Sequence, residues 1–325
     1  MKKPNRISEE MKQGSNGSRN PPRPNQPLTE LPKGVAADLA LPNATLGQFW
    51  SKIKLNDERQ KDRILAMALL SFTLRSKVDF ASLPMHGFIL LVGPPGTGKT
   101  SLAKGLAHRI AESFPSNGKF RYLEIDPHAL ANSGLGRSQQ SVRKLLSELI
   151  PERLAAGPLI VLLDEVETLA TDRSKLSLEA NPVDVHRSTD AVLASLDQLT
   201  SNHPNLLFIA TSNFAEAVDP ALISRADLVE QIALPNRETA EAILRDAVHA
   251  LSLNFSAAKH ILGSPEFAQA AEACHGLDGR QIRKTVILAC AMSKETALDP
   301  GQLKIEDIIR AAEISKSSQN EGKRA

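Results

Sequence analysis

The chain has 325 residues, of which 42% are apolar and 23% charged, with a formal net charge of +2 at pH 7, and this length suits about two domains. It contains no apolar run long enough to span a membrane, no apolar segment of a signal peptide near its start, and only two cysteines. These features exclude a membrane-spanning protein and a secreted disulfide scaffold, and they predict a cytoplasmic protein.

Residues 1–44 have the composition of a disordered, basic leader. They contain seven of the twenty prolines and few large apolar residues, so they cannot bury enough surface to offset the entropy lost on ordering. Residues 1–33 carry seven Lys and Arg against three Glu, a net charge of +4 that leaves −2 for the remaining chain. A slightly acidic body argues against a broad nucleic-acid interface, although the leader alone could contact nucleic acid.

Residues 45–235 are predicted to form a nucleotide-binding α/β domain with a five-stranded parallel sheet that has helices on both faces. Two amphipathic helices are expected between Leu46 and Phe72. Five apolar runs then alternate with helical stretches, as a sheet buried on both faces requires. The expected strands are Phe88–Val92, Phe120–Ile125, Leu159–Leu163, Leu206–Thr211 and Val229–Leu234, and the expected helices are Ser101–Ser113, Gln139–Ile150, Arg187–Gln198 and Pro220–Ser224.

After Pro235 the strand pattern stops, and residues 236–315 are predicted to form a small all-α lid domain. Its expected helices are Arg237–Leu251, Pro265–Cys274, Gly279–Met292 and Ile305–Ile314. Residues 316–325 are polar and are expected to form a flexible tail.

A phosphate-binding loop follows the first expected strand. Residues 93–101 have the sequence Gly-Pro-Pro-Gly-Thr-Gly-Lys-Thr-Ser, which fits the pattern G-x-x-x-x-G-K-[ST] between a buried strand and a helix. The glycines let backbone N–H groups converge on phosphate oxygens, while Lys99 offers a positive charge and Thr100 a hydroxyl ligand for Mg²⁺. The predicted nucleoside-triphosphate site comprises Gly93, Pro94, Pro95, Gly96, Thr97, Gly98, Lys99, Thr100 and Ser101.

Polar side chains end the next two central strands of the predicted sheet. Asp164 and Glu165 follow Leu159–Leu163, and Asn213 follows the Leu206–Thr211 strand. The carboxyl ends of parallel strands present ligand-binding groups at one edge of the sheet. We therefore expect Asp164 to hold Mg²⁺, Glu165 to deprotonate the attacking water, and Asn213 to sense the γ-phosphate or that water.

Two arginines beyond these strands are further candidates. Arg225 follows the segment Asp219–Ser224, and its planar guanidinium suits a phosphate, so in a ring of subunits it could act across an interface as an arginine finger. Arg280 opens a lid helix and could reach the nucleotide. The alternatives are a surface cation for Arg225 and a basic helix face for Arg280.

Together these motifs resemble the AAA+ ATPases over residues 46–315. A narrower similarity is to the pachytene-checkpoint ATPases, and it is carried by Ser224–Asp227, Gly276–Lys284 and Pro182–Arg187. That resemblance implies ATP and Mg²⁺ as cofactors, a homohexamer, and remodelling of a HORMA-domain partner that is pulled through a central pore. Bacterial members accompany cyclic-oligonucleotide anti-phage systems, which implies a nucleotidyltransferase complex reached through that partner.

Two departures from the resembled family bear on mechanism. A leader replaces the folded N-terminal domain of eukaryotic members, and Leu135 stands where the pore loop usually carries an aromatic residue, so its grip on a threaded chain is smaller. Two other functions stay open: a nucleic-acid-acting AAA+ ATPase of the helicase or transposase-loader type, and a nucleotide-controlled scaffold that does no mechanical work.

Overall fold

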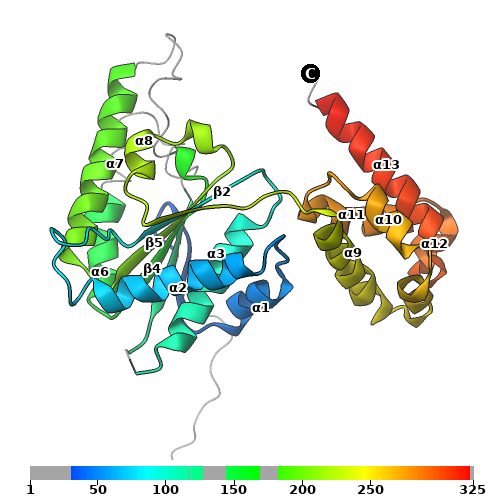
Figure 1. The fold of residues 1–325 in the computed structure, drawn as a ribbon, viewed down its shortest axis with the longest axis horizontal. Coiled ribbons are helices and arrows are strands. Elements are labelled where there is room, and N and C mark those ends of the chain that lie inside the picture. The colour runs from blue at the N-terminus through cyan, green and yellow to red at the C-terminus, as the bar shows by residue number, and fades with distance from the viewer. Residues whose placement is uncertain (1–30, 117, 127–143, 169–181, 323–325) are drawn as a thin grey trace, which may run out of the picture. The chain divides into compact units, whose positions relative to one another are not determined.

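The computed structural model describes residues 31–116, 118–126, 144–168 and 182–322, which belong to one compact unit (Figure 1). A six-stranded sheet in the order β1-β3-β4-β5-β2-β6 organises the first part of these residues. All neighbouring strands are parallel except β1, which pairs antiparallel with β3. The strands are β1 (Val35–Ala40), β2 (Phe88–Val92), β3 (Arg121–Ile125), β4 (Leu159–Leu163), β5 (Leu206–Ser212) and β6 (Leu228–Gln231).

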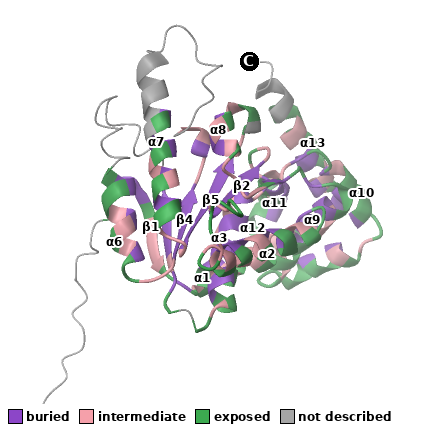
Figure 2. Ribbon diagram, turned by 60° about the vertical axis from the view of Figure 1, so that its left-hand side comes forward, coloured by how far each residue is buried: buried purple, intermediate pink, exposed green. Residues whose placement is uncertain are grey.

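Helices cover both faces of this sheet, as the continuous apolar runs predict (Figure 2). Residues Ile89 and Leu91 of β2 pack into the core beneath α1 (Ala44–Lys52), α2 (Arg59–Leu74) and α3 (Lys99–Ser113). Phe88 and Leu90 point to the opposite core. That core is covered by a π-helix η1 (Leu145–Leu149), α6 (Ile150–Leu154), α7 (Pro182–Asn202) and α8 (Pro220–Ile223).

The remaining residues form the predicted helical region around a core of its own. Asn236 caps the first of its helices through a hydrogen bond from Thr239 N to its Oδ1 (2.8 Å). The elements are α9 (Arg237–Ser252), η5 (Ser256–Gly263), α10 (Phe267–Ala273), α11 (Gly279–Cys290), α12 (Lys294–Leu298), η6 (Pro300–Gln302) and α13 (Ile305–Gly322). No helix among the described residues has the length and apolar character needed to cross a membrane.

The sheet has a sixth strand, β1, within residues that the composition places in the disordered leader. The sequence of β1 is Val-Ala-Ala-Asp-Leu-Ala, whose small side chains give a weak strand pattern. Its carboxylate at Asp38 is nearly buried and pairs with Arg121 on β3 and Arg153 on α6. The prediction for residues 31–44 is therefore wrong, because contacts distant in sequence stabilise this edge strand. Residues 1–30 lie outside the described residues.

Element bounds differ from the predicted ones in four further places. α13 continues to Gly322 because no helix-breaking residue interrupts its polar end, so the predicted tail is helical over residues 316–322. α7 begins at Pro182 rather than Arg187. β6 ends at Gln231 rather than Leu234, while η1 and α6 stand where a single helix to Ile150 was expected.

Candidate active site

The phosphate-binding loop connects β2 to α3 at the carboxyl edge of the sheet. Gly93 and Gly96 have φ angles of 150° and 78°, which non-glycine residues rarely adopt. A Cβ atom on Gly93 would lie 2.1 Å from the carbonyl oxygen of Ile232, and one on Gly96 would lie 2.2 Å from Cγ of Asp278. The loop can therefore keep this shape only with glycine at both positions.

Lys99 begins α3, and its side chain is buried, with 5% of the residue exposed. Its ammonium donates hydrogen bonds to the carbonyl oxygens of Gly93 (2.8 Å) and Pro94 (2.9 Å) and to Oδ1 of Asn213 (2.9 Å). Burial lowers the pKa of Lys99, and the charge of Glu167 is the strongest influence acting against that shift. The loop carbonyls and Asn213, which directly follows β5, thus hold the Lys99 ammonium within the phosphate-binding loop.

Asp164, directly after β4, accepts two hydrogen bonds on its Oδ1 atom. The donors are Oγ1 of Thr100 on α3 (2.8 Å) and Oγ1 of Thr211 on β5 (2.5 Å). The sequence predicted that Thr100 and Asp164 come together, and the structure places their oxygen atoms side by side. Thr211 was not predicted; its only signal in the sequence is a polar residue near the end of an apolar strand.

Glu165 is the only non-glycine residue with positive φ in the part of the chain that the structure describes, at 53°. Its backbone N–H donates to Oγ1 of Thr211 (3.1 Å), and its Oε1 accepts from Nδ2 of Asn213 (3.1 Å). A non-glycine residue held in this conformation is costly and marks functional sites. The turn directs the Glu165 carboxylate towards the end of β5.

Asn213 joins the cation to this carboxylate. Its amide oxygen accepts from Lys99 while its amide nitrogen donates to Glu165, and its backbone N–H donates to Oε1 of Glu167 (3.1 Å). Glu167 was not predicted as a site residue, although it lies two positions after Glu165. The three side chains of Lys99, Glu165 and Asn213 form one hydrogen-bonded unit that can fix a carboxylate next to bound phosphate.

A cavity of about 440 Å³ lies over the loop and falls in the size range of small-molecule sites. Asp164, Glu165 and Asn213 line it, and so does Arg280 from the first turn of α11. Asp278 caps α11 by accepting from the backbone N–H groups of Arg280 (2.8 Å) and Gln281 (2.9 Å), which places the exposed Arg280 at the cavity. The predicted lid arginine therefore lines the cavity that lies over the predicted loop.

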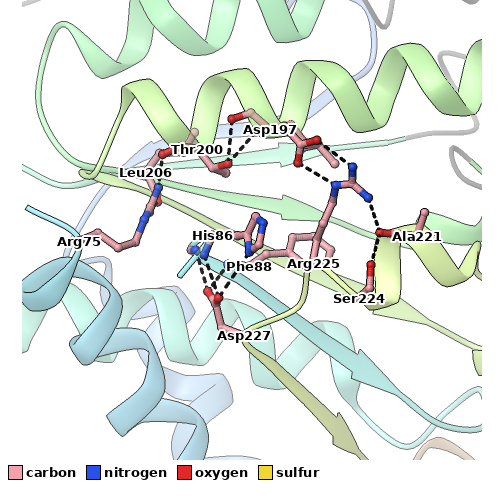
Figure 3. Close-up of polar contacts among 12 residues, drawn as sticks. Arg75, His86, Phe88, Asp197, Thr200, Leu206, Ala221, Ser224, Arg225 and Asp227 are labelled. Carbon is pink, nitrogen blue, oxygen red and sulfur yellow. Dashed lines mark hydrogen bonds and ion pairs between the residues drawn. The ribbon is translucent and has the colours of Figure 1, made fainter. Parts of the chain in front are cut away.

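Arg225 does not line that cavity. It follows α8, and its guanidinium pairs with the Asp197 carboxylate of α7: Nε lies 2.7 Å from Oδ1, and Nη2 lies 2.8 Å from Oδ2 (Figure 3). A second hollow, of about 390 Å³, is lined by Phe80, His86, Asp197, Ser201, Ser224 and Arg225. Within the described residues, Arg225 is thus separate from its own chain's nucleotide site.

Comparisons with known proteins agree with this geometry. Residues 89–234 match the model of the ATPase family associated with various cellular activities (AAA). Over 292 residues the chain is 51% identical to CD-NTase-associated protein 6 of Pseudomonas aeruginosa, which covers 90% of this chain and 95% of that protein. The chain belongs to the AAA ATPases. It therefore binds ATP and is an ATPase.

More distant relatives of this AAA ATPase share its fold. It is 30% identical over 315 residues to the pachytene checkpoint protein 2 homolog of Oryza sativa subsp. indica, covering 86% of this chain and 66% of that protein. The structure of C. elegans PCH-2 superposes with a TM-score of 0.69 at 23% identity, over 88% of this chain and 77% of that one. A chain in the structure of the E. coli MS115-1 HORMA:CdnC:Trip13 complex superposes with a TM-score of 0.67 at 16% identity. That match covers 86% of this chain and 94% of the other.

Proposed function

We propose that this AAA ATPase is a ring-forming remodeller of a HORMA-domain protein in a bacterial anti-phage system. The observation that carries the proposal is the 51% identity, over nearly the whole length of both chains, to a CD-NTase-associated protein. The E. coli structure of similar fold is a HORMA:CdnC:Trip13 complex, which supports the same kind of partner. The nucleotidyltransferase would then be reached through the HORMA protein.

The oxygen donors at the site fit Mg²⁺ together with ATP. No cluster of three His, Cys, Asp or Glu residues that could hold a metal occurs in the described residues. Mg²⁺ needs no such cluster, because it is usually held by one or two protein oxygens and the substrate phosphates. Thr100 and Asp164 would hold the ion, which neutralises developing charge on the phosphates.

The chain's own residues would then divide the work of hydrolysis. Lys99 and the loop N–H groups bind the β- and γ-phosphates. Glu165 accepts the proton of the attacking water on its carboxylate, and Asn213 orients that carboxylate through the 3.1 Å hydrogen bond. Arg280 contributes positive charge from the lid.

Arg225 would complete the site of a neighbouring subunit. It lies outside the cavity of its own chain, in the segment that connects α8 to β6. An arginine can stabilise the transition state of phosphoryl transfer from another subunit. We propose a homohexamer in which each Arg225 acts on the ATP of its neighbour.

The remodelling step rests on a segment that lies outside the described residues. Leu135, the proposed pore-loop residue, is within residues 127–143. The proposal places the whole cycle in the cytoplasm, where ATP is available and thiols such as Cys274 and Cys290 stay reduced.

The test of this function uses purified protein, ATP and a HORMA-domain protein of an anti-phage system. Wild-type protein should change the hydrogen-exchange pattern of the HORMA protein while consuming ATP, and Glu165→Gln should bind it stably without changing it. Leu135→Ala should hydrolyse ATP but leave the HORMA protein unchanged. ATPase activity that responds to DNA in a salt-dependent way, and not to the HORMA protein, would favour the nucleic-acid alternative instead.

A further inference from the structure

Arg225 is already bound to a carboxylate of its own chain. Besides its two bonds to Asp197, its Nη1 donates to the carbonyl oxygen of Ala221 (2.6 Å) (Figure 3). A guanidinium has five N–H groups, so these contacts use three of them. The side chain that we propose to act on a neighbouring ATP is therefore largely committed within its own subunit.

The Asp197 carboxylate competes with phosphate for the same face of Arg225. Each presents a pair of oxygen acceptors that two N–H groups of a guanidinium can bind at once. The hydrogen bond to Asp197 raises the pKa of Arg225 and keeps the side chain charged, but the pair as a whole is neutral. A neutral pair attracts an incoming nucleotide phosphate far less than an unpaired arginine would.

The pair is weak enough to exchange. The Asp197 side chain is 42% exposed and the Arg225 side chain 26% exposed. Solvent screens such a pair, so it shifts an equilibrium by at most about fivefold. A triphosphate carries several negative charges, and contacts at a subunit interface shield it from water, so it can replace a single partly solvated carboxylate.

The backbone near Arg225 is fixed, whereas its guanidinium has room to move. Asp227, two residues later, accepts three backbone hydrogen bonds, from His86 (2.8 Å), Gly87 (2.6 Å) and Phe88 (2.9 Å), which anchors the segment to β2. The hollow of about 390 Å³ beside the guanidinium provides space for a new side-chain position.

The backbone of Asp197, the other member of the pair, is fixed too. Arg75, at the end of α2, donates to the carbonyl oxygens of Thr200 (2.5 Å), His203 (3.2 Å) and Leu206, and so ties the end of α7 to β5 (Figure 3). Asp197 lies one turn before Thr200, so its backbone cannot follow Arg225 when that side chain turns away. Exchange of the pair is thus a side-chain event between two rigid elements.

We propose that Asp197 is a positioning residue that holds Arg225 within its own subunit until the phosphate of a neighbour's ATP displaces it. Asp197 thereby raises the subunit concentration at which ATP assembles active rings. This inference rests on the proposed role of Arg225 across the subunit interface.

The test replaces Asp197→Asn, which removes the charge and keeps the shape. Assembly with ATP is measured by mass photometry in a Glu165→Gln background, and turnover is measured against subunit concentration in the wild-type background. The subunit concentration at half-maximal assembly and at half-maximal turnover should each fall about three- to fivefold. Turnover at saturating subunit concentration should stay the same. Asp197→Glu, which keeps the charge, should retain the wild-type midpoint, and so should Glu148→Gln, which removes an exposed acid elsewhere in the same domain.

Three results would overturn the inference: an unchanged midpoint, a midpoint that rises, or a fall that persists when Arg225→Ala is added. A rise would mean that Asp197 aims Arg225 at the interface instead of withholding it. Failure of the underlying proposal is distinguishable, because Arg225→Ala alone would then leave turnover unchanged. Thermal melting of each variant confirms that all compared proteins are folded.

Discussion

Two cations of the α/β domain that we propose to act on ATP, Lys99 and Arg225, are held in opposite ways. Lys99 is 5% exposed and bonds to two loop carbonyls and to Asn213, and both Lys99 and Asn213 line the cavity proposed for ATP. Arg225 has a side chain that is 26% exposed and bonds to one partly exposed carboxylate and to the carbonyl oxygen of Ala221, all outside that cavity. The first cation is organised before the ligand arrives, whereas the second has a partner that it can exchange.

Arg225→Ala should have the largest effect of the substitutions that test these different roles of Lys99 and Arg225. We expect turnover by assembled protein to fall by about 10³-fold, the magnitude typical of an arginine that stabilises phosphoryl transfer from outside the nucleotide-binding subunit. ATP affinity of the dilute protein should be unchanged, because Arg225 does not line the cavity of its own chain. A weakened ATP affinity, measured by fluorescent-nucleotide titration, would contradict the claim that Arg225 does not contact the ATP of its own chain.

Glu165→Gln removes the carboxylate that Asn213 orients. Turnover should fall by about 10²–10³-fold, as expected for loss of a general base, while ATP binding should remain. Single-turnover hydrolysis and nucleotide titration measure the two effects separately. Hydrolysis at the wild-type rate would remove Glu165 from the mechanism, and Glu148→Gln serves as the control for loss of an exposed acid.

Asn213→Ala breaks the link between Lys99 and Glu165 without removing either charge. One hydrogen bond to each charged partner is lost, so we expect turnover to fall by about 10- to 100-fold. A fall equal to that of Glu165→Gln would mean that Asn213 contacts the reacting water directly.

The smallest effect concerns stability and lies away from both cations. Burial of Asp38 raises the pKa of its carboxyl, but hydrogen bonds from Arg121 and Arg153 outweigh that and hold the pKa below its ordinary value. Asp38→Asn should cost about 2 kcal/mol of unfolding free energy at pH 7, since it leaves two arginines without their carboxylate. A folded-state pKa below the unfolded one means that this contribution is complete above about pH 5 and is lost as the pH falls through the unfolded and then the folded pKa.

Urea unfolding of wild type and Asp38→Asn, measured from pH 7 down to pH 3, checks this sign. The difference between the two proteins should shrink only at the acid end. A difference that is constant over the whole range would show that Asp38 acts through packing rather than charge.

The predictable part of the fold and site is the part that a local pattern encodes. The five apolar runs from Phe88 to Leu234 predicted β2 to β6, because strands buried on both faces must be continuously apolar. β1 was missed because small residues form it and its carboxylate pairs with arginines 83 and 115 residues away.

Within the site, too, residues of short motifs were predicted, whereas residues positioned by contacts distant in sequence were not. Thr100 and Asp164 belong to short motifs that predict a shared site, and the structure joins them by a hydrogen bond as expected. Thr211 and Asp197 were not predicted, because their partners are set by strand register and by the packing of α7 against α8. The Asp197–Arg225 pair joins residues 28 positions apart, on separate elements.

The central claim is that each nucleotide site is completed by the Arg225 of another subunit. It is tested most directly by mixing Glu165→Gln subunits with Arg225→Ala subunits in equal amounts and measuring ATP turnover. Each variant is inactive alone, but about a quarter of the interfaces in random rings would join an intact Glu165 to a neighbour's intact Arg225. The account predicts that the mixture recovers activity well above the sum of the two variants. Activity equal to that sum would contradict it.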